Sequence, residues 1–391
     1  MKWLRNLLDS VGDQFEKRKT LKKFWPIYEA ADNILFTPTI TTKSAPHIRD
    51  SLDMKRVMIL VVIAIVPCYI FGILNLGFQT SLAEGVTRTW SQILLFGLKI
   101  IAPIILITFI AGAVWEILFA VVRKHEINEG FLVTCALIPL IVPPEIPLWQ
   151  VFVATSFGIV IGKEIFGGVG MNIFNPALVA RAFLFFAYPA SISGDRVWIS
   201  ATDGYSGATA LAVSTSESAE NAVTLLNQFQ QFDYSWWNMF WGWIPGSIGE
   251  TSAAMILIGA IILMYTKIGS WRIMTGSVIG LVLTALLTNL FSPISTNTML
   301  TLPPHYHLVM GGFLFGTVFM ATDPVSAAQT NRGRWIYGFM IGFLTVIIRS
   351  INPAYPEGTM LAILLMNAFA PLIDYFIVQT NIKKRLARYA Q

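Results

Sequence analysis

The chain has 391 residues, of which 55% are hydrophobic and only 13% are charged. A soluble domain is about a quarter charged, so these charges are too few to cover a globular surface. The net charge of +5 does not indicate a nucleic-acid partner, because Lys and Arg gather near the N-terminus and in short segments between long apolar runs. That arrangement is typical of an integral membrane protein in a lipid bilayer.

Residues 1–56 are polar and basic and precede the first apolar run. Within them, apolar residues recur at the spacing of one helix face, at Leu4, Leu7, Leu8, Val11 and Phe15. Basic residues follow at positions 17–19. This pattern predicts an amphipathic helix in a cytoplasmic extension, which either lies on the membrane face or binds a partner protein of a complex.

Ten apolar segments follow, at 57–78, 95–122, 131–143, 148–163, 170–190, 251–268, 273–292, 310–322, 335–351 and 358–379. A helix that crosses a bilayer needs about 20 residues. The third and eighth segments are shorter and run into proline-containing stretches, so we expect them to be half-helices. The sequence therefore predicts an all-α integral membrane fold with about ten transmembrane segments.

The distribution of Lys and Arg orients the chain. With the N-terminus in the cytoplasm, nearly all basic residues outside the apolar segments are cytoplasmic, and the exceptions are Arg88, Arg196 and Arg349. The reverse orientation would invert this bias. We therefore predict that both termini are cytoplasmic, with a basic tail at 380–391, and that the loop at 191–250 lies outside.

An internal repeat divides the chain. Residues 171–176 (Met-Asn-Ile-Phe-Asn-Pro) resemble residues 366–371 (Met-Asn-Ala-Phe-Ala-Pro), and a His-x4-Gly-Phe-Leu pattern occurs at His125 and again at His307. Chance similarity among common membrane residues is the alternative reading. A true repeat predicts two five-helix halves. Because five is an odd number, the second half would be inverted relative to the first.

The repeat boundaries give the domain organisation. We place the first five-helix repeat at 57–190, the connecting loop at 191–250 and the second repeat at 251–379. Sites in inverted-repeat proteins usually lie where helices are broken near the membrane centre, so we expect functional residues at the two half-helices.

The connecting loop contains the heptapeptide Asp-Gly-Tyr-Ser-Gly-Ala-Thr, which ends at Thr209. Gly204 and Gly207 favour tight turns, and Thr209 has a hydroxyl that can be esterified. The loop contains no His or Cys, so Thr209 has no local base to activate it as a nucleophile. Another enzyme would have to modify it, and an ordinary glycine-containing turn is the alternative.

This heptapeptide resembles the site at which a flavin transferase attaches FMN, through its phosphate, to threonine. The matching positions are Asp203, Ser206, Gly207, Ala208 and Thr209. The site marks the Nqr B / Rnf D family, which comprises subunits of the sodium-translocating NADH:quinone oxidoreductase and of the Rnf complex. The resemblance extends over essentially the whole chain.

Two features favour the Nqr type over the Rnf type, namely the long N-terminal extension and the residues at 41–56. The resemblance then implies a membrane flavoprotein subunit of a redox-driven sodium pump in the bacterial inner membrane. Electrons from NADH would arrive through other subunits (of the A, C, D, E and F type) and pass through covalent FMN and non-covalent riboflavin to ubiquinone, coupled to Na⁺ export.

The family resemblance assigns riboflavin contacts to Asn172 and Asn175. Two amides three residues apart on a helix share a face, and an amide both donates and accepts hydrogen bonds. Hydrogen bonding between helices by buried asparagine is the alternative. Because Ala370 stands where the repeat would need a second amide, we expect no equivalent flavin site in the second half.

Three acidic residues in or beside apolar segments resemble cation-handling positions of the family: Glu116, Asp323 and Asp374. Membrane acids are costly and usually functional, and sodium, like calcium, prefers oxygen ligands. The alternatives are a surface acid for Glu116 and a cap on a helix break for Asp323.

With the family resemblance, the two half-helices look like a hydrophobic constriction in the ion path. Phe315 and Phe319 are spaced i, i+4 in one, while Val133, Ala136 and Leu140 share a face of the other. Such a constriction gates by excluding water. Ordinary membrane core is the alternative.

Gly112 and Ala113 resemble the stretch that borders the family's quinone site, although the family more often has glycine at the second position. Close helix packing through small residues is the alternative.

Two rival functions remain open from the sequence. One is the Rnf D subunit, which works with ferredoxin and NAD without quinone. The other is a passive solute channel of the urea type, which has similar inverted repeats but needs no flavin-attachment loop.

Overall fold

The computed structural model describes residues 54–123, 130–200, 206–215, 221–295, 297–351 and 357–389, together with single positions 5, 10, 12, 44 and 45. The amphipathic helix predicted near the N-terminus and Asp203 of the heptapeptide lie outside these ranges. Within them the fold is entirely helical, without strands.

Every predicted apolar segment overlaps a helix, and the principal helices are α3 (Met54–Ala83), α4 (Trp90–Arg123), α5 (Gly130–Ile141), α6 (Leu148–Gly162), α7 (Pro176–Ala187), α12 (Ala253–Tyr265), α13 (Trp271–Phe291), α15 (Phe313–Phe315) continued by the π-helical turn η5 (Gly316–Met320), α16 (Asn331–Ile351) and α17 (Thr359–Tyr389). Among the described residues, six helices are long and apolar enough to cross a membrane, and α5, α7 and α12 are shorter apolar helices. The all-helical membrane fold is therefore confirmed, whereas the ten-span inverted repeat stays a prediction.

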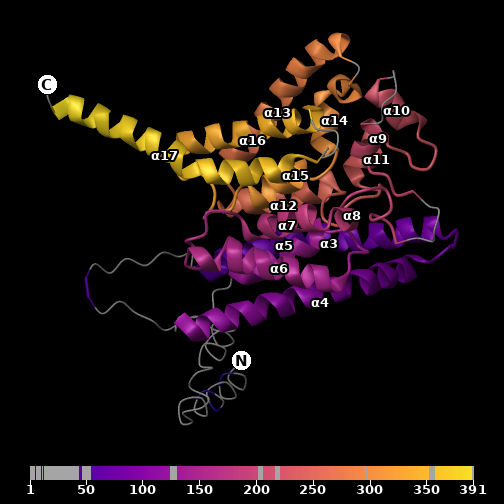
Figure 1. Ribbon diagram of the computed structural model, residues 1–391, viewed down its shortest axis with the longest axis horizontal. Coiled ribbons are helices and arrows are strands. Elements are labelled where there is room, and N and C mark those ends of the chain that lie inside the picture. The colour runs from indigo at the N-terminus through magenta and orange to yellow at the C-terminus, as the bar shows by residue number, and fades with distance from the viewer. Residues whose placement is uncertain are drawn as a thin grey trace.

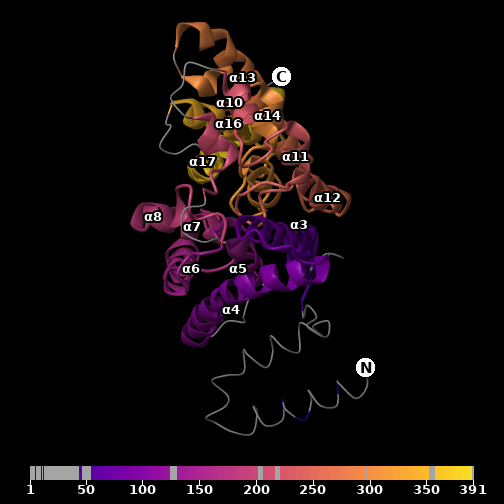
Figure 2. The same ribbon diagram turned by 90° about the vertical axis from the view of Figure 1, so that its right-hand side faces the viewer.

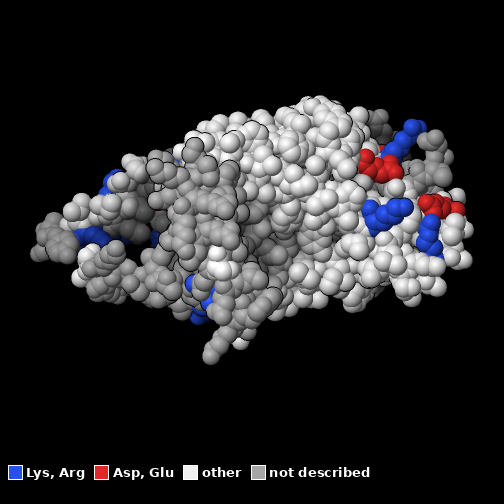
Figure 3. All heavy atoms as spheres, turned by 90° about the horizontal axis from the view of Figure 1, so that it is seen from below, with Lys and Arg blue, Asp and Glu red and all other residues white. Residues whose placement is uncertain are grey.

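The principal helices run roughly along the long axis of the molecule (Figure 1). Helices α3–α7 lie together on one side and α12–α17 on the other, in both ribbon views (Figures 1 and 2). The connecting loop stands at one end, which we call the loop end. The C-terminus of α17 projects from the other, which we call the tail end. In Figure 3 a broad uncharged surface separates the charged side chains at one end from those toward the other, as a bilayer requires.

Glycines allow α13 and α16 to approach closely. Gly276 and Gly280 on α13, and Gly338 and Gly342 on α16, are each four residues apart. A Cβ atom at Gly280 would overlap the carbonyl oxygen of Phe339, and one at Gly342 would overlap that of Ser277. Small residues at this spacing are typical of helix pairs in membranes, where van der Waals packing drives association.

The connecting loop is itself folded. It contains α8 (Pro189–Ile192), α9 (Ala210–Ser214), α10 (Ala222–Gln228) and α11 (Trp236–Trp241), and it packs with α14 (Pro304–Val309). Together these segments enclose a second hydrophobic cluster that includes Tyr234, Met239 and Met310. The loop end is therefore a compact cap that holds its residues in fixed positions.

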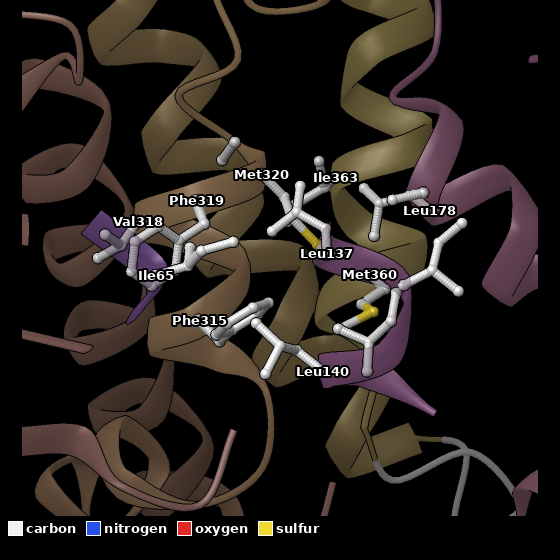
Figure 4. Close-up of a cluster of buried hydrophobic side chains, with 14 of the residues drawn as sticks. Ile65, Leu137, Leu140, Leu178, Phe315, Val318, Phe319, Met320, Met360 and Ile363 are labelled. Carbon is white, nitrogen blue, oxygen red and sulfur yellow. The ribbon is translucent and has the colours of Figure 1, made fainter. Parts of the chain in front are cut away.

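The two predicted half-helices face each other in the main hydrophobic cluster. Figure 4 shows Phe315, Val318 and Phe319 of α15–η5 lying near Ile65 of α3 and Leu140 of α5, and all belong to one buried cluster. The π-helical turn is unusual, since such turns are rare and are frequently found at functional sites.

Candidate functional site

Thr209 caps the N-terminus of α9. Its side-chain oxygen accepts a hydrogen bond from the backbone N–H of Ala212 at 3.3 Å. The preceding residues are also held, because Gly207 N donates to Asp195 O at 2.6 Å and the Tyr234 hydroxyl donates to Ala208 O. Thr209 remains partly exposed. The cap uses its oxygen only as an acceptor, so the oxygen is held in place on a residue that is partly exposed.

A cavity of ≈ 110 Å³ at the loop end has Thr209 in its wall. This volume accommodates several water molecules. Three charged residues also line the cavity, and they come from distant parts of the chain: Arg181, Glu250 and Glu357. The attachment threonine and a buried charge cluster therefore share one cavity.

Arg181 connects this cluster. Its Nη1 donates to Glu250 Oε1 at 2.9 Å and to the Ile141 carbonyl at 2.7 Å. Its Nη2 pairs with the Glu357 carboxylate. Arg181 is 4% exposed. Neither glutamate was predicted from the sequence, although one signal was available: an arginine inside an apolar segment needs partners.

Arg349 lies nearby but contacts backbone. Its guanidinium donates to the carbonyl oxygens of His307 and Met310 at 2.8 Å and to that of Glu357 at 3.3 Å. It is fully buried. Arg349 thus fixes the backbone that carries Glu357, while Arg181 pairs with its carboxylate.

The predicted constriction residues come together. The rings of Phe315 and Phe319 are 5.1 Å apart, and Leu140 is fully buried with them. Gly249 lies between the two half-helices. Its N–H donates to Leu140 O at 2.8 Å, and a Cβ there would lie 3.0 Å from the Phe315 ring. Val133 is partly buried.

A small cavity of ≈ 40 Å³ adjoins the constriction, with Val133, Phe319, Asn175 and Asp323 in its wall. Asp323 also lines a larger cavity of ≈ 480 Å³ beside Lys267 at the tail end. Its carboxylate accepts a hydrogen bond from the Ser326 hydroxyl at 2.6 Å. Asp323 therefore stabilises a turn, as one reading expected, and also stands between two cavities.

Asn172 and Asn175 do not share a helix face, so that part of the prediction was wrong. Helix α7 begins only at Pro176, because the preceding segment turns through Gly167, Gly168 and Gly170, all of which have positive φ. Asn175 caps α7 by accepting from Ala177 N at 3.0 Å. Asn172 donates to Phe174 O at 3.0 Å. Both amides are buried, but each is engaged locally.

Tyr337 and Asn367 add a contact that was not predicted from the sequence. The hydroxyl of Tyr337 and the Asn367 side chain are hydrogen-bonded at 2.6 Å, and both residues are fully buried. The predicted repeat pairs Asn367 with Asn172, and in the structure Asn367 joins α16 to α17.

Glu116 belongs to a second buried charge cluster at the tail end. Its carboxylate pairs with Lys163, which also contacts Glu164 at 3.2 Å. Arg123 contacts Glu164 at 3.1 Å. Glu116 is 1% exposed, so the reading of Glu116 as a surface acid was wrong.

Asp374 holds a turn at the tail end. Its carboxylate accepts from the backbone N–H of Gln329 at 2.6 Å and from that of Thr330 at 3.0 Å. The Thr330 hydroxyl donates to it at 2.5 Å. Asp374 thus ties α17 to the segment that follows Asp323.

Gly112 marks a close approach between α4 and α5, because a Cβ there would overlap the Cys135 sulfur. Ala113 is partly exposed. Nearby, Trp115 Nε1 is buried without a hydrogen-bond partner.

The chain is similar to known proteins over nearly its whole length. A model of the NQR2, RnfD, RnfE family matches residues 41–383. The B subunit of the Na(+)-translocating NADH-quinone reductase of Chromohalobacter salexigens is 50% identical over 99% of this chain and 97% of its own length. The B subunits of the same enzyme from Klebsiella pneumoniae and Azotobacter vinelandii are both 49% identical over 98% of this chain and 99% of their own lengths.

Proposed function

This chain belongs to the NQR2, RnfD, RnfE family, and on that basis we propose that it is the B-type subunit of a sodium-translocating NADH-quinone reductase. The observation that carries the proposal is the identity of about half of its residues with named B subunits, end to end. The test is quinone reduction by NADH in membranes from cells with and without this chain. Loss of a Na⁺-stimulated rate on deletion supports the proposal, and an unchanged rate refutes it.

Measurements on the same membranes distinguish this function from two rivals. An Rnf-type subunit would give ferredoxin-dependent NAD reduction without quinone reductase activity. A passive channel would give solute flux without bound flavin. The named relatives above are all B subunits of the quinone-reducing enzyme, which favours a sodium-translocating NADH-quinone reductase over both rivals.

We propose that Thr209 carries FMN as a phosphoester formed by a separate flavin transferase. The support is geometric: the Thr209 oxygen is held by the α9 cap, and the residue is partly exposed and lines a cavity. Bound FMN supplies transfer of one or two electrons. The chain's own part is to hold the attachment oxygen on a folded cap at the loop end, which we place on the periplasmic side.

Riboflavin does not fit between the helices at Asn175 as they pack here. The adjoining cavity of ≈ 40 Å³ has room for about three water molecules, which is far less than a three-ring flavin. The segment before α7 instead exposes apolar side chains, including Ile165 at 61% and Met171 at 69%. We propose that riboflavin lies between this surface and a neighbouring subunit. Asn172 and Asn175 would hold the backbone of their own segment in place for its contacts with the flavin.

We propose that sodium passes between the half-helices, at the constriction of Phe315, Phe319, Leu140 and Val133. Asp323 is the best-placed ligand on the cytoplasmic side because it lines two cavities. Glu116 and Asp374 are engaged by Lys163 and by backbone amides, so they would shape the tail-end entrance without holding the ion.

We place the quinone beside Gly112 and Ala113 on α4. The close approach at Gly112 and the partial exposure of Ala113 support a shallow surface site. The other subunits of the complex and the N-terminal extension would complete it.

A further inference from the structure

The constriction has an oxygen-rich cavity on its loop-end side as well as on its tail-end side. Gly249 donates its N–H to the Leu140 carbonyl, and a Cβ on it would lie 3.0 Å from the Phe315 ring. The next residue, Glu250, lines the cavity that contains Thr209. An ion that passes the constriction toward the loop end therefore reaches Glu250 first.

The oxygen atoms around this cavity suit a hard cation. Glu250 and Glu357 supply carboxylates, and the Ser247 hydroxyl donates to Glu250 Oε2 at 2.5 Å. Thr251 also lines the cavity, is 4% exposed, and has an Oγ1 with no hydrogen-bond partner. A buried hydroxyl without a partner is costly, and a bound cation or a water molecule would satisfy it.

We propose that this cavity binds an alkali cation through Glu250, Glu357 and Thr251, and that Arg181 is the resident counter-ion that the cation displaces. The cation in the working complex is Na⁺ on its way out, so the inference rests on the proposed function.

Charge balance explains why displacement is needed. Arg181 and Arg349 together already balance the two carboxylates. A further cation would add net positive charge to a buried site, where unpaired charge is strongly unfavourable. The cation avoids this excess only by taking the place of the Arg181 guanidinium, which must then leave both carboxylates and the Ile141 carbonyl.

Displacement would also loosen a connection between the halves. Arg181 is in α7, whereas Glu250 precedes α12 and Glu357 precedes α17. Arg181 therefore bridges the first half to two helices of the second half, directly beside the constriction. Ion binding at the exit would release that bridge, which couples occupancy of the site to the relative positions of α5 and α15.

The experiment uses inverted membrane vesicles that contain the whole complex. Their bath faces the tail end and their lumen faces the loop end. Initial rates of quinone reduction by NADH are measured with the membrane potential clamped, at fixed bath Na⁺ and increasing lumenal Na⁺. Lumenal Na⁺ occupies the exit site and slows turnover. The variants are Glu250→Gln, Glu357→Gln, Arg181→Gln and the charge-balanced pair Arg181→Gln with Glu250→Gln.

We expect Glu250→Gln and Glu357→Gln to raise the lumenal Na⁺ concentration for half-inhibition by about tenfold, and Arg181→Gln to lower it. The double variant restores charge balance if Arg181→Gln alone fails to fold, and its half-inhibition concentration should lie below that of Glu250→Gln. Glu84→Gln, which alters a carboxylate paired with Arg88 at the same end, is the matched control and should change nothing.

An unchanged half-inhibition constant in Glu250→Gln and in Glu357→Gln would overturn the inference, as would a rise in Arg181→Gln or a double variant that does not fall below Glu250→Gln. Bath Na⁺ tests the proposed function separately. A wild-type rate of quinone reduction that does not depend on bath Na⁺ would refute the proposed pump. A wild-type rate that bath Na⁺ stimulates, with unchanged half-inhibition constants in the variants, would refute only the exit site.

Discussion

The molecule has a buried charge cluster at each end, and the two differ in how they are built. At the tail end, Glu116 and Glu164 face Lys163 and Arg123, and the pairs join α4 to the end of α6 and the residues just after it. At the loop end, Arg181 alone is shared by Glu250 and Glu357, which are 69 and 176 residues away. That cluster lines a cavity with Thr209. Two cations serve two carboxylates at the tail end, which suits that cluster to holding neighbouring helices together. At the loop end one arginine serves two carboxylates from distant segments, which suits that cluster to exchange.

The largest expected effect concerns the loop end. Thr209→Ala should abolish the covalent flavin completely, because the variant has no oxygen to esterify. The measurement is flavin fluorescence of this polypeptide on a denaturing gel. Thr215→Ala, at the other end of α9, is the control and should remain fluorescent. A fluorescent Thr209→Ala band would place the attachment elsewhere.

The tail-end cluster should respond in stability. Lys163→Met leaves the buried carboxylates of Glu116 and Glu164 without their shared partner, which should cost about 3–5 kcal/mol. Thermal unfolding of the purified complex and the amount of assembled protein measure this. The change Lys163→Met combined with Glu116→Gln should recover part of the loss. Wild-type stability in the single variant would show that the charge pairs do not hold these helices together.

The ion path should respond in sodium dependence. Asp323→Asn removes a charged oxygen ligand between two cavities, so the bath Na⁺ concentration for half-maximal turnover should rise by about tenfold. Asp374→Asn is the comparison, since its carboxylate mainly accepts backbone hydrogen bonds. It should lower stability without moving that concentration. Equal shifts in both variants would mean that Asp323 acts through structure alone.

The smallest effect is expected at the quinone stretch. Gly112→Ala places a methyl group against the Cys135 sulfur and should destabilise the protein by about 1–3 kcal/mol. Ala113→Gly removes a partly exposed methyl group and should cost about 0.5–1 kcal/mol. If the quinone lies here, both variants change the KM for quinone more than the KM for NADH. Unchanged quinone kinetics in both would move the site away from α4.

Local patterns predicted much of this architecture. The apolar segments and the short third and eighth helices follow from segment length and hydrophobicity. The meeting of Phe315 with Leu140 was expected from the predicted repeat and from the family resemblance. The predicted Asn172–Asn175 face was wrong because local signals end the helix there: Asn followed by Pro at 175–176 is an N-cap with proline at the first helical position, and three nearby glycines favour turns. A helix that starts at Pro176 was therefore readable from the sequence.

The charge clusters could not be predicted in the same way. Arg181, Glu250 and Glu357 have no common spacing, and their contact depends on how α7, α12 and α17 assemble. Sequence reasoning could say that Arg181 needs a partner in the membrane, but not which acid supplies it. For the same reason the cavity beside Thr209 was not foreseen, although Thr209 itself was.

The most direct test of the account is NADH-driven uptake of radioactive Na⁺ into inverted vesicles, compared between cells with this chain, without it, and with Thr209→Ala. We predict uptake only in the first, insensitive to agents that collapse a proton gradient. NADH-driven Na⁺ uptake that persists at the full rate without this chain would contradict the claim that it is part of a redox-driven sodium pump.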